Sequence, residues 1–269
     1  MRLHEQGYRE SNRRGWNQLA RDSSVHSTPV GPDDFPWARQ IIDPQGWLPW
    51  RRIRTVLCLA SAGGQQAPLL ASLGLRVTVA DLSPDQLALD REVASRYELD
   101  LECVEVDMQD LTPLRGRRFD FVYQPVSMIY VPDPRRVYAE VAALQAPGGI
   151  YRVAHWNPVQ MQLPAAGAWD GEGYRLTLPQ QPAPVSFGTS GPRTPGDPWT
   201  NCVHYVHPLD DLLGGLCDAG YVVTRLSEWS PDADGQPPDT AEHRGTYIPT
   251  VLTVLARRRG ERVRTGGQP

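Results

Sequence analysis

The stretch TVLCLASAGG, residues 55–64, is followed by RVTVADLSPDQL at residues 76–87. Each begins with a short apolar run, which is typical of a strand buried on both faces of a sheet. Between them, residues 66–73 show helical spacing and end at Gly74, a residue that favours helix termination. This order predicts a strand–helix–strand unit in which the two strands are parallel.

The same alternation continues along the chain. Ser83-Pro84 is a residue order that favours a helix start, and a helical pattern follows it to residue 97. Further strands are predicted over 101–106, 119–123, 150–154, 221–226 and 247–256, and further helices over 12–21, 134–144 and 209–219. The pattern indicates an α/β fold built on an open, parallel sheet with helices on both faces.

The strand and helix signals divide the chain into segments. These signals are found in residues 51–156 and again in residues 201–258. We expect the two segments together to form the central sheet and its helices. Residues 1–50 and 157–200 are rich in proline and longer than ordinary connections, so we expect both to act as lids. Residues 259–269 are expected to form a disordered tail.

Composition narrows the class of protein. The 269 residues carry a net charge of −4, which argues against nucleic acid as a partner, and every basic side chain is arginine. No apolar run is long enough to cross a membrane, and the polar N-terminus does not resemble a secretory signal, so a cytoplasmic protein is expected. The four cysteines are scattered without metal-ligand spacing, so no metal site is predicted.

The loop after the first strand is the first place to expect a ligand, because open parallel sheets bind at the carboxyl ends of their strands. Its small residues, Ala60 to Gly64, allow a ligand to lie against the backbone. The second strand ends in Asp81, whose carboxylate is suited to accept hydrogen bonds from both hydroxyls of a ribose. Together the two features predict a ligand that contains a nucleoside.

Five segments, taken together, resemble the class I S-adenosylmethionine-dependent methyltransferases. They are VLCLASAGG (56–64), VTVADLSPDQL (77–87), VEVDMQDL (104–111), FDFVYQPVS (119–127) and LQAPGGIY (144–151), in family order and at family spacing. The resemblance implies a Rossmann-like sheet of seven strands, mostly parallel, with the last strand antiparallel. It also implies S-adenosylmethionine as cofactor and S-adenosylhomocysteine as product.

The resemblance assigns a role to each matching position. Asp81 would hold the ribose hydroxyls with Leu82 against the adenine, and Asp107 would accept from the adenine amino group while Met108 covers the ring. The full predicted cofactor set is Ala60, Ser61, Ala62, Gly63, Gly64, Gln65, Asp81, Leu82, Asp107, Met108, Gln124, Pro125 and Ser127. Of these, residues 124–127 would form the floor near the methyl group.

Three positions depart from the family pattern. The family has an acid where this chain has Cys58, and glycines where it has Ala60 and Ala62. The contact usually made to the methionine amino group must therefore come from elsewhere, and Gln65 or Gln66 are candidates. Simpler roles stay open for other positions: Cys58 as a packed core residue, and Asp81 as a cap of the following helix.

The acceptor side is less defined. His155 follows the fifth strand and is a candidate general base, because imidazole titrates near neutral pH; a structural role at the lid hinge is the alternative. Trp16, Tyr130 and Trp156 are predicted to line the acceptor pocket. Aromatic residues elsewhere in the two lids would add to it: Tyr8, Phe35, Trp37, Trp47, Trp50, Trp169, Tyr174, Phe187 and Trp199.

The leading functional hypothesis is methyl transfer to a small molecule, aromatic or largely apolar, at O, N, S or an activated carbon. The protein is expected to be a monomer or a homodimer. The alternatives are a non-catalytic protein that binds S-adenosylmethionine and an enzyme that methylates nucleic-acid bases. The loop sequence does not form GxGxxG, which argues against an NAD-dependent dehydrogenase.

Overall fold

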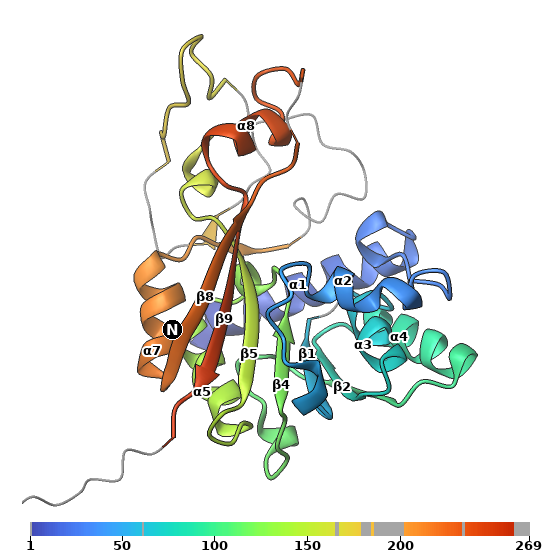
Figure 1. The fold of residues 1–269 in the computed structure, drawn as a ribbon. Coiled ribbons are helices and arrows are strands. Elements are labelled where there is room, and N and C mark those ends of the chain that lie inside the picture. Colours follow the sequence, from blue (N-terminus) through green and yellow to red (C-terminus); the bar gives the residue numbers. More distant parts are fainter. Residues whose placement is uncertain are drawn as a thin grey trace, which may run out of the picture.

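A mixed sheet of seven strands forms the centre of the molecule in a computed structural model (Figure 1). The structure describes residues 2–60, 62–164, 167–178, 184–185, 202–232 and 235–260. The strand order is β3-β2-β1-β4-β5-β9-β8, with β9 antiparallel to both of its neighbours. This arrangement confirms the predicted Rossmann-like fold and its antiparallel closing strand.

The elements follow one another along the chain as the sequence predicts for most of its length. The sheet strands are β1 (Thr55–Leu59), β2 (Arg76–Asp81), β3 (Leu101–Glu105), β4 (Phe121–Gln124), β5 (Ile150–Trp156), β8 (Tyr221–Trp229) and β9 (Val251–Arg258). Two short strands, β6 (Pro184–Val185) and β7 (His204–Tyr205), pair with each other outside the main sheet. The helices are α1 (Arg2–Arg21), α2 (Ala38–Ile42), α3 (Gln66–Ser72), α4 (Pro84–Tyr97), α5 (Pro134–Ala143), α7 (Gly215–Asp218, after a π-helical turn at Asp210–Gly214) and α8 (Ala241–Tyr247).

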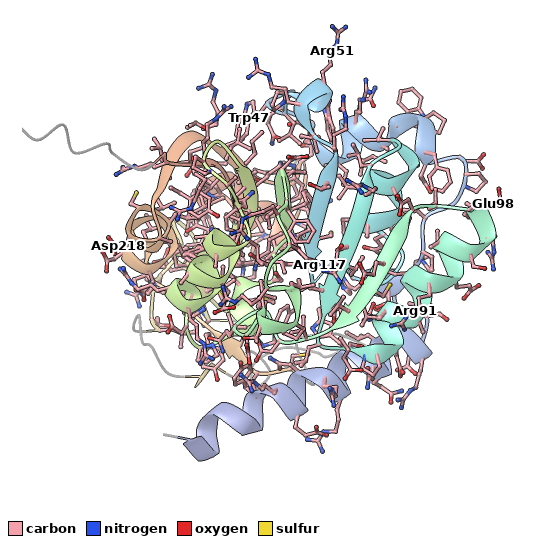
Figure 2. The ribbon with its side chains drawn as sticks, turned by 90° about the horizontal axis from the view of Figure 1, so that it is seen from below. Trp47, Arg51, Arg91, Glu98, Arg117 and Asp218 are labelled. Atoms are coloured by element: carbon pink, nitrogen blue, oxygen red, sulfur yellow. The ribbon has the colours of Figure 1, made fainter. Side chains whose placement is uncertain are left out.

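Alternate residues of the central strands face two separate cores, which explains why these strands are apolar throughout. In β1, Leu57 belongs to the core under α5 and α7. Val56 and Cys58 point the other way, into the core under α2 and α3. Charged side chains such as Arg51, Glu98 and Asp218 lie at the rim and point outward (Figure 2).

We expect Cys58→Ser to lower the free energy of unfolding by about 1–3 kcal/mol, because it places a hydroxyl in a fully buried apolar site. The affinity for cofactor should stay within a few-fold, because the side chain packs inside the core. Thermal unfolding and calorimetric titration measure the two quantities. A large loss of affinity at an unchanged melting temperature would contradict this role for Cys58.

The N-terminal segment divides into two parts. Helix α1 begins ten residues earlier than the predicted span of 12–21, and it crosses the carboxyl ends of the parallel strands (Figure 1). The part around α2 packs instead against the core under α3, where Phe35, Trp47 and Trp50 are partly buried. Only the first part therefore covers the edge of the sheet where a ligand is expected.

Strands β8 and β9 extend beyond the parallel strands and carry α8 at their far end (Figure 1). Residues 241–247 are helical, so the predicted strand from 247 begins later, at Val251. Trp169 and Tyr174 pack here against His243 and Tyr247, with ring centroids 5.0 to 5.7 Å apart. None of the helices in the described part of the chain is both long enough and apolar enough to cross a membrane.

Candidate functional site

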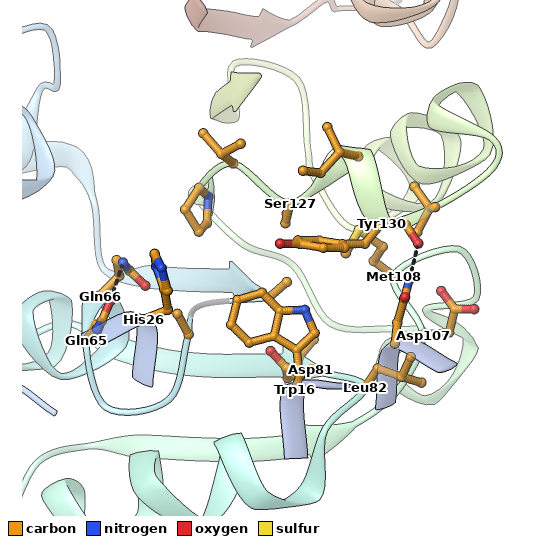
Figure 3. A pocket seen from close by; sticks show the side chains of 18 of the residues that line it. Trp16, His26, Gln65, Gln66, Asp81, Leu82, Asp107, Met108, Ser127 and Tyr130 are labelled. Carbon is orange, nitrogen blue, oxygen red and sulfur yellow. Dashed lines mark hydrogen bonds between the residues drawn. The ribbon is translucent and has the colours of Figure 1, made fainter. Parts of the chain in front are cut away.

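A cavity of about 360 Å³ opens at the carboxyl edge of the sheet (Figure 3). This volume lies within the usual range for small-molecule sites, about 300–1,000 Å³. Its wall comes from α1, the turn at residues 25–26, and the segments that follow β1, β2, β3 and β4, with Trp156 at the end of β5. Segments far apart in the sequence thus meet at the edge where open parallel sheets bind ligands.

The loop after β1 brings its backbone close to the cavity. Ala60 and Ala62 line the wall, and both have a φ of 49°, in the left-handed region that glycine adopts without strain. The loop therefore keeps a left-handed backbone at the two positions where the family has glycine and this chain has alanine. Gly63 and Gly64 do not line the cavity; they are buried against Gln86 and Pro29. Ser61 lies outside the described residues.

Asp81 stands at the end of β2 with its carboxylate on the cavity wall. Oδ1 accepts a hydrogen bond from the backbone N–H of Ser83 at 2.8 Å, and Ser83 itself caps α4. Burial raises the pKa of Asp81 to about 6, and the hydrogen bonds from Ser83 and Leu82 partly oppose that rise. Asp81 therefore holds the turn into α4 and also faces the cavity beside Leu82, as an acid that accepts from ribose hydroxyls must.

Asp107 follows β3 and faces both the cavity and α1. Its Oδ1 accepts from the backbone N–H of Gln109 at 2.9 Å, and its Oδ2 accepts from the hydroxyl of Tyr8 at 2.6 Å and pairs with Arg9. Burial and the contact with Asp107 raise the pKa of Tyr8, so this hydroxyl stays protonated and donates. Asp107 thus anchors the N-terminal helix at the cavity, in addition to the adenine contact that the sequence predicts for it.

The loop after β4 forms one wall of the cavity. Pro125, Ser127 and, from the loop after β3, Met108 line it. Gln124 does not; it is fully buried and its Nε2 donates to Ser127 Oγ at 3.0 Å and contacts Met108 Sδ at 3.4 Å. Gln124 is therefore a positioning residue behind the wall.

The residues predicted for the acceptor pocket come together in the cavity. Trp16 from α1 packs edge-on against Tyr130, with ring centroids 5.4 Å apart, and Trp156 also lines the cavity. Figure 3 shows the Trp16 and Tyr130 rings close to each other, with His26 on the side of the cavity where Gln65 and Gln66 lie. The other aromatics predicted for this role do not line the cavity, except Tyr8, and Phe187 and Trp199 lie outside the described residues.

The residues present fit a nucleoside-containing cofactor with an amino-acid tail. The carboxylate of Asp81, the close backbone at Ala60 and Ala62, and a buried amide oxygen of Gln66 that lacks a partner among the described residues supply the needed contacts. No three histidine, cysteine or carboxylate side chains in the described ranges gather closely enough to hold a metal ion.

Comparison with known proteins identifies the family. A family defined as "Methyltransferase domain" matches residues 57–153. YbaJ of Bacillus subtilis (strain 168), an uncharacterized methyltransferase, is 31% identical over 188 residues, which span 69% of this chain and 72% of that one. The chain belongs to the class I S-adenosylmethionine-dependent methyltransferases.

Other proteins resemble the methyltransferase more distantly. A ubiquinone biosynthesis O-methyltransferase of Bordetella avium (strain 197N) is 26% identical over 157 residues, 58% of this chain and 62% of that one. The crystal structure of an S-adenosylmethionine-dependent methyltransferase from Mesorhizobium loti shares the fold, with a TM-score of 0.59, 22% identity, and coverage of 85% of this chain and 99% of that one. The protein is an enzyme, and its cofactor is S-adenosylmethionine.

The turn at residues 24–30 is a part of the methyltransferase site that the sequence did not reveal. Gln65 Nε2 donates to the carbonyls of Val25 and Thr28, at 3.0 and 3.2 Å, and the N–H of Val30 donates to Gly64 at 2.8 Å. These bonds hold the turn on the loop after β1 and place His26 on the cavity wall. The paired residues lie more than thirty positions apart, so no local pattern signals their contact.

His155 occupies a different environment from the one predicted. It is buried in β5, away from the cavity, with its Nε2 3.2 Å from the Tyr138 hydroxyl. Burial, with a smaller contribution from His207, lowers the pKa of His155 to about 3. A neutral side chain packed among core residues favours the structural alternative for His155.

We expect the His155 ring of the methyltransferase to remain neutral from pH 8 down to pH 5, where an ordinary histidine becomes protonated near pH 6.5. The reason is that its surroundings cannot solvate a charge. Nitrogen chemical shifts of the ring, followed by NMR, report its protonation directly. A midpoint near 6.5 would contradict the buried position.

Proposed function

We propose that the methyltransferase acts on a small, largely apolar molecule whose aromatic part packs against Trp16, Tyr130 and Trp156. The observation that supports this most strongly is the gathering of these three rings in one cavity with Asp81. Aromatic rings bury flat apolar surfaces well, and their faces attract cations such as a sulfonium. The net charge of −4 argues against a nucleic-acid acceptor.

The structure suggests how the chain's residues would assist the reaction. S-adenosylmethionine, when bound, supplies a methyl group that is already activated on a sulfonium. Helix α1 lines the cavity and would limit the access of water to it, and the wall at Pro125 and Ser127 would position the acceptor against the cofactor. His26 is the histidine among the residues that line the cavity. Its imidazole is suited to take up the proton that a hydroxyl of the methyl acceptor releases. The distant similarity to an O-methyltransferase supports oxygen as the methylated atom.

Two measurements test the cofactor assignment. S-adenosylhomocysteine should bind in calorimetric titration, and NAD should not. In hydrogen exchange, S-adenosylhomocysteine should protect residues 10–25 together with the loop at 60–66, because the two contact the same cavity. Protection confined to the loop and the strand ends would show that α1 does not close over the cofactor.

The acceptor class is tested by transfer of labelled methyl groups to a panel of aromatic hydroxyl compounds. Trp156→Ala should lower turnover about 10-fold or more by loosening the acceptor, while the affinity for S-adenosylhomocysteine changes little. The matched control is Trp229→Ala, because Trp229 is 55% exposed on β8, the edge strand. Transfer to DNA or RNA in preference to the panel would contradict the proposal.

A further inference from the structure

The amino-acid end of the cofactor has no acid to hold it at the usual position. The family carries a carboxylate where this chain has Cys58, and Cys58 is fully buried in the core under α3. The carboxylates on the cavity wall belong to Asp81 and Asp107, which follow β2 and β3. The α-ammonium group therefore needs another acceptor near the loop after β1.

We infer that Gln66 replaces the missing acid and accepts a hydrogen bond from the ammonium group of the cofactor through Oε1. Gln66 is the first residue of α3 and lines the cavity directly after the cofactor loop. Its Oε1 is buried and has no hydrogen-bond partner among the described residues. Buried polar atoms are nearly always paired, so an unpaired one in a residue that lines a ligand cavity is left for a partner that the described residues do not supply.

The neighbouring amide fixes the direction in which Gln66 points. Gln66 Nε2 lies 3.4 Å from Gln65 Oε1, to which it donates (Figure 3). Gln65 uses its own Nε2 on the carbonyls of Val25 and Thr28, so its amide is committed to holding the turn at residues 24–30. Gln65 is therefore a positioning residue. The oxygen of Gln66, Oε1, is the atom that can still accept a hydrogen bond from the ligand.

This inference concerns the cofactor alone and holds for any acceptor. Gln66 and an ammonium group complement each other, because a neutral amide oxygen accepts and an ammonium offers three donors. Unlike an acid, the amide adds no negative charge to a loop that already lies near the buried carboxyl groups of Asp81 and Asp90. Asp90 Oδ1 accepts from the N–H of Gly64 at 2.9 Å, which places this carboxyl group directly behind the loop.

The test compares two ligands that differ only at the amino-acid end. S-adenosylhomocysteine carries the ammonium and carboxylate, and 5′-methylthioadenosine has the same adenosine and sulfur without them. Gln66→Ala should weaken binding of S-adenosylhomocysteine about 10-fold, the loss expected for a hydrogen bond to a charged group, and leave 5′-methylthioadenosine within two-fold. Gln66→Glu should retain most of the binding of S-adenosylhomocysteine, because its carboxylate oxygen can also accept from the ammonium.

The controls separate contact from folding. Gln65→Ala should cause a smaller loss, confined to S-adenosylhomocysteine, and Gln18→Ala, at an exposed position of α1, should have no effect. An equal loss for both ligands in Gln66→Ala, or no loss for either, would overturn the assignment to Gln66. If the unaltered protein binds 5′-methylthioadenosine as tightly as S-adenosylhomocysteine, the amino-acid end is not recognised and the inference fails. Failure of the unaltered protein to bind either ligand would instead refute the cofactor assignment.

Discussion

Asp81→Asn should lower the affinity of the methyltransferase for S-adenosylhomocysteine by about 1–3 kcal/mol, roughly 5- to 150-fold, because a carboxylate accepts stronger hydrogen bonds from ribose hydroxyls than an amide does. The same variant should melt at a higher temperature than the unaltered protein at pH 7.5. Burial raises the pKa of Asp81 to about 6 from 3.8, so this group contributes stability that is present below pH 3.8 and lost as the pH rises through 6. Asparagine does not ionise and avoids that loss.

The pH dependence of binding gives a second measurement on Asp81. The charged form accepts from the ribose, so the affinity for S-adenosylhomocysteine should fall as the pH decreases below about 6 and level off above it. In Asp81→Asn this dependence should flatten. Glu92→Gln, on the exposed side of α4, is the matched control and should leave the profile unchanged. An unaltered affinity in a folded Asp81 variant would remove this residue from the site.

Gly63→Ala should disrupt the site through packing. A Cβ at this position would lie 2.5 Å from Gln86 Oε1 and 2.8 Å from the Gln86 carbonyl, closer than real atoms approach. Gln86 Nε2 also donates to the Trp16 carbonyl and to Ser27 Oγ, so a displaced Gln86 releases both α1 and the turn at residues 24–30. We expect a loss of about 1–3 kcal/mol in unfolding free energy and up to about 100-fold in affinity for S-adenosylhomocysteine.

Gly31→Ala provides the comparison for Gly63→Ala. A Cβ at Gly31 meets no atom within 4 Å, and its backbone does not require glycine, so the melting temperature and the affinity should remain near those of the unaltered protein. Equal behaviour of the two variants would show that the contact of Gly63 with Gln86 does not position the loop.

The core of the fold was predictable because each strand carries its own local signal. The apolar run at residues 55–59 and the acid that ends β2 determine both the sheet and the position of Asp81, with no distant information needed. Helix α8 was missed because residues 241–247 have no apolar spacing; its start is marked by Thr240, whose side chain caps it. The first half of α1 was missed for a similar reason: its residues are mostly polar, and the contacts of Tyr8 and Arg9 with Asp107 form only in the folded protein.

The site was only partly predictable. Trp16, Tyr130 and Trp156 were expected at the cavity and line it, but aromatic composition does not tell which face a ring packs on, and Trp47 and Trp50 lie in the other core. The contact of Asn12 with the carbonyls of Tyr130 and Val203 joins residues more than a hundred positions apart. Such pairs arise only after the chain has folded, and one sequence holds no local trace of them.

Helix α1 is fastened over the cavity by arginine side chains. Arg9 pairs with Asp107, Arg13 with Glu105, and Arg21 with Asp85 at 2.7 Å, and each pair includes at least one partly exposed side chain. Ion pairs near the surface weaken as dissolved salt shortens the Debye length, from about 10 Å at 0.1 M to about 3 Å at 1 M. Raising the ionic strength should therefore loosen helix α1 and speed the dissociation of bound cofactor. The residence time of the cofactor on the enzyme then depends on the salt concentration.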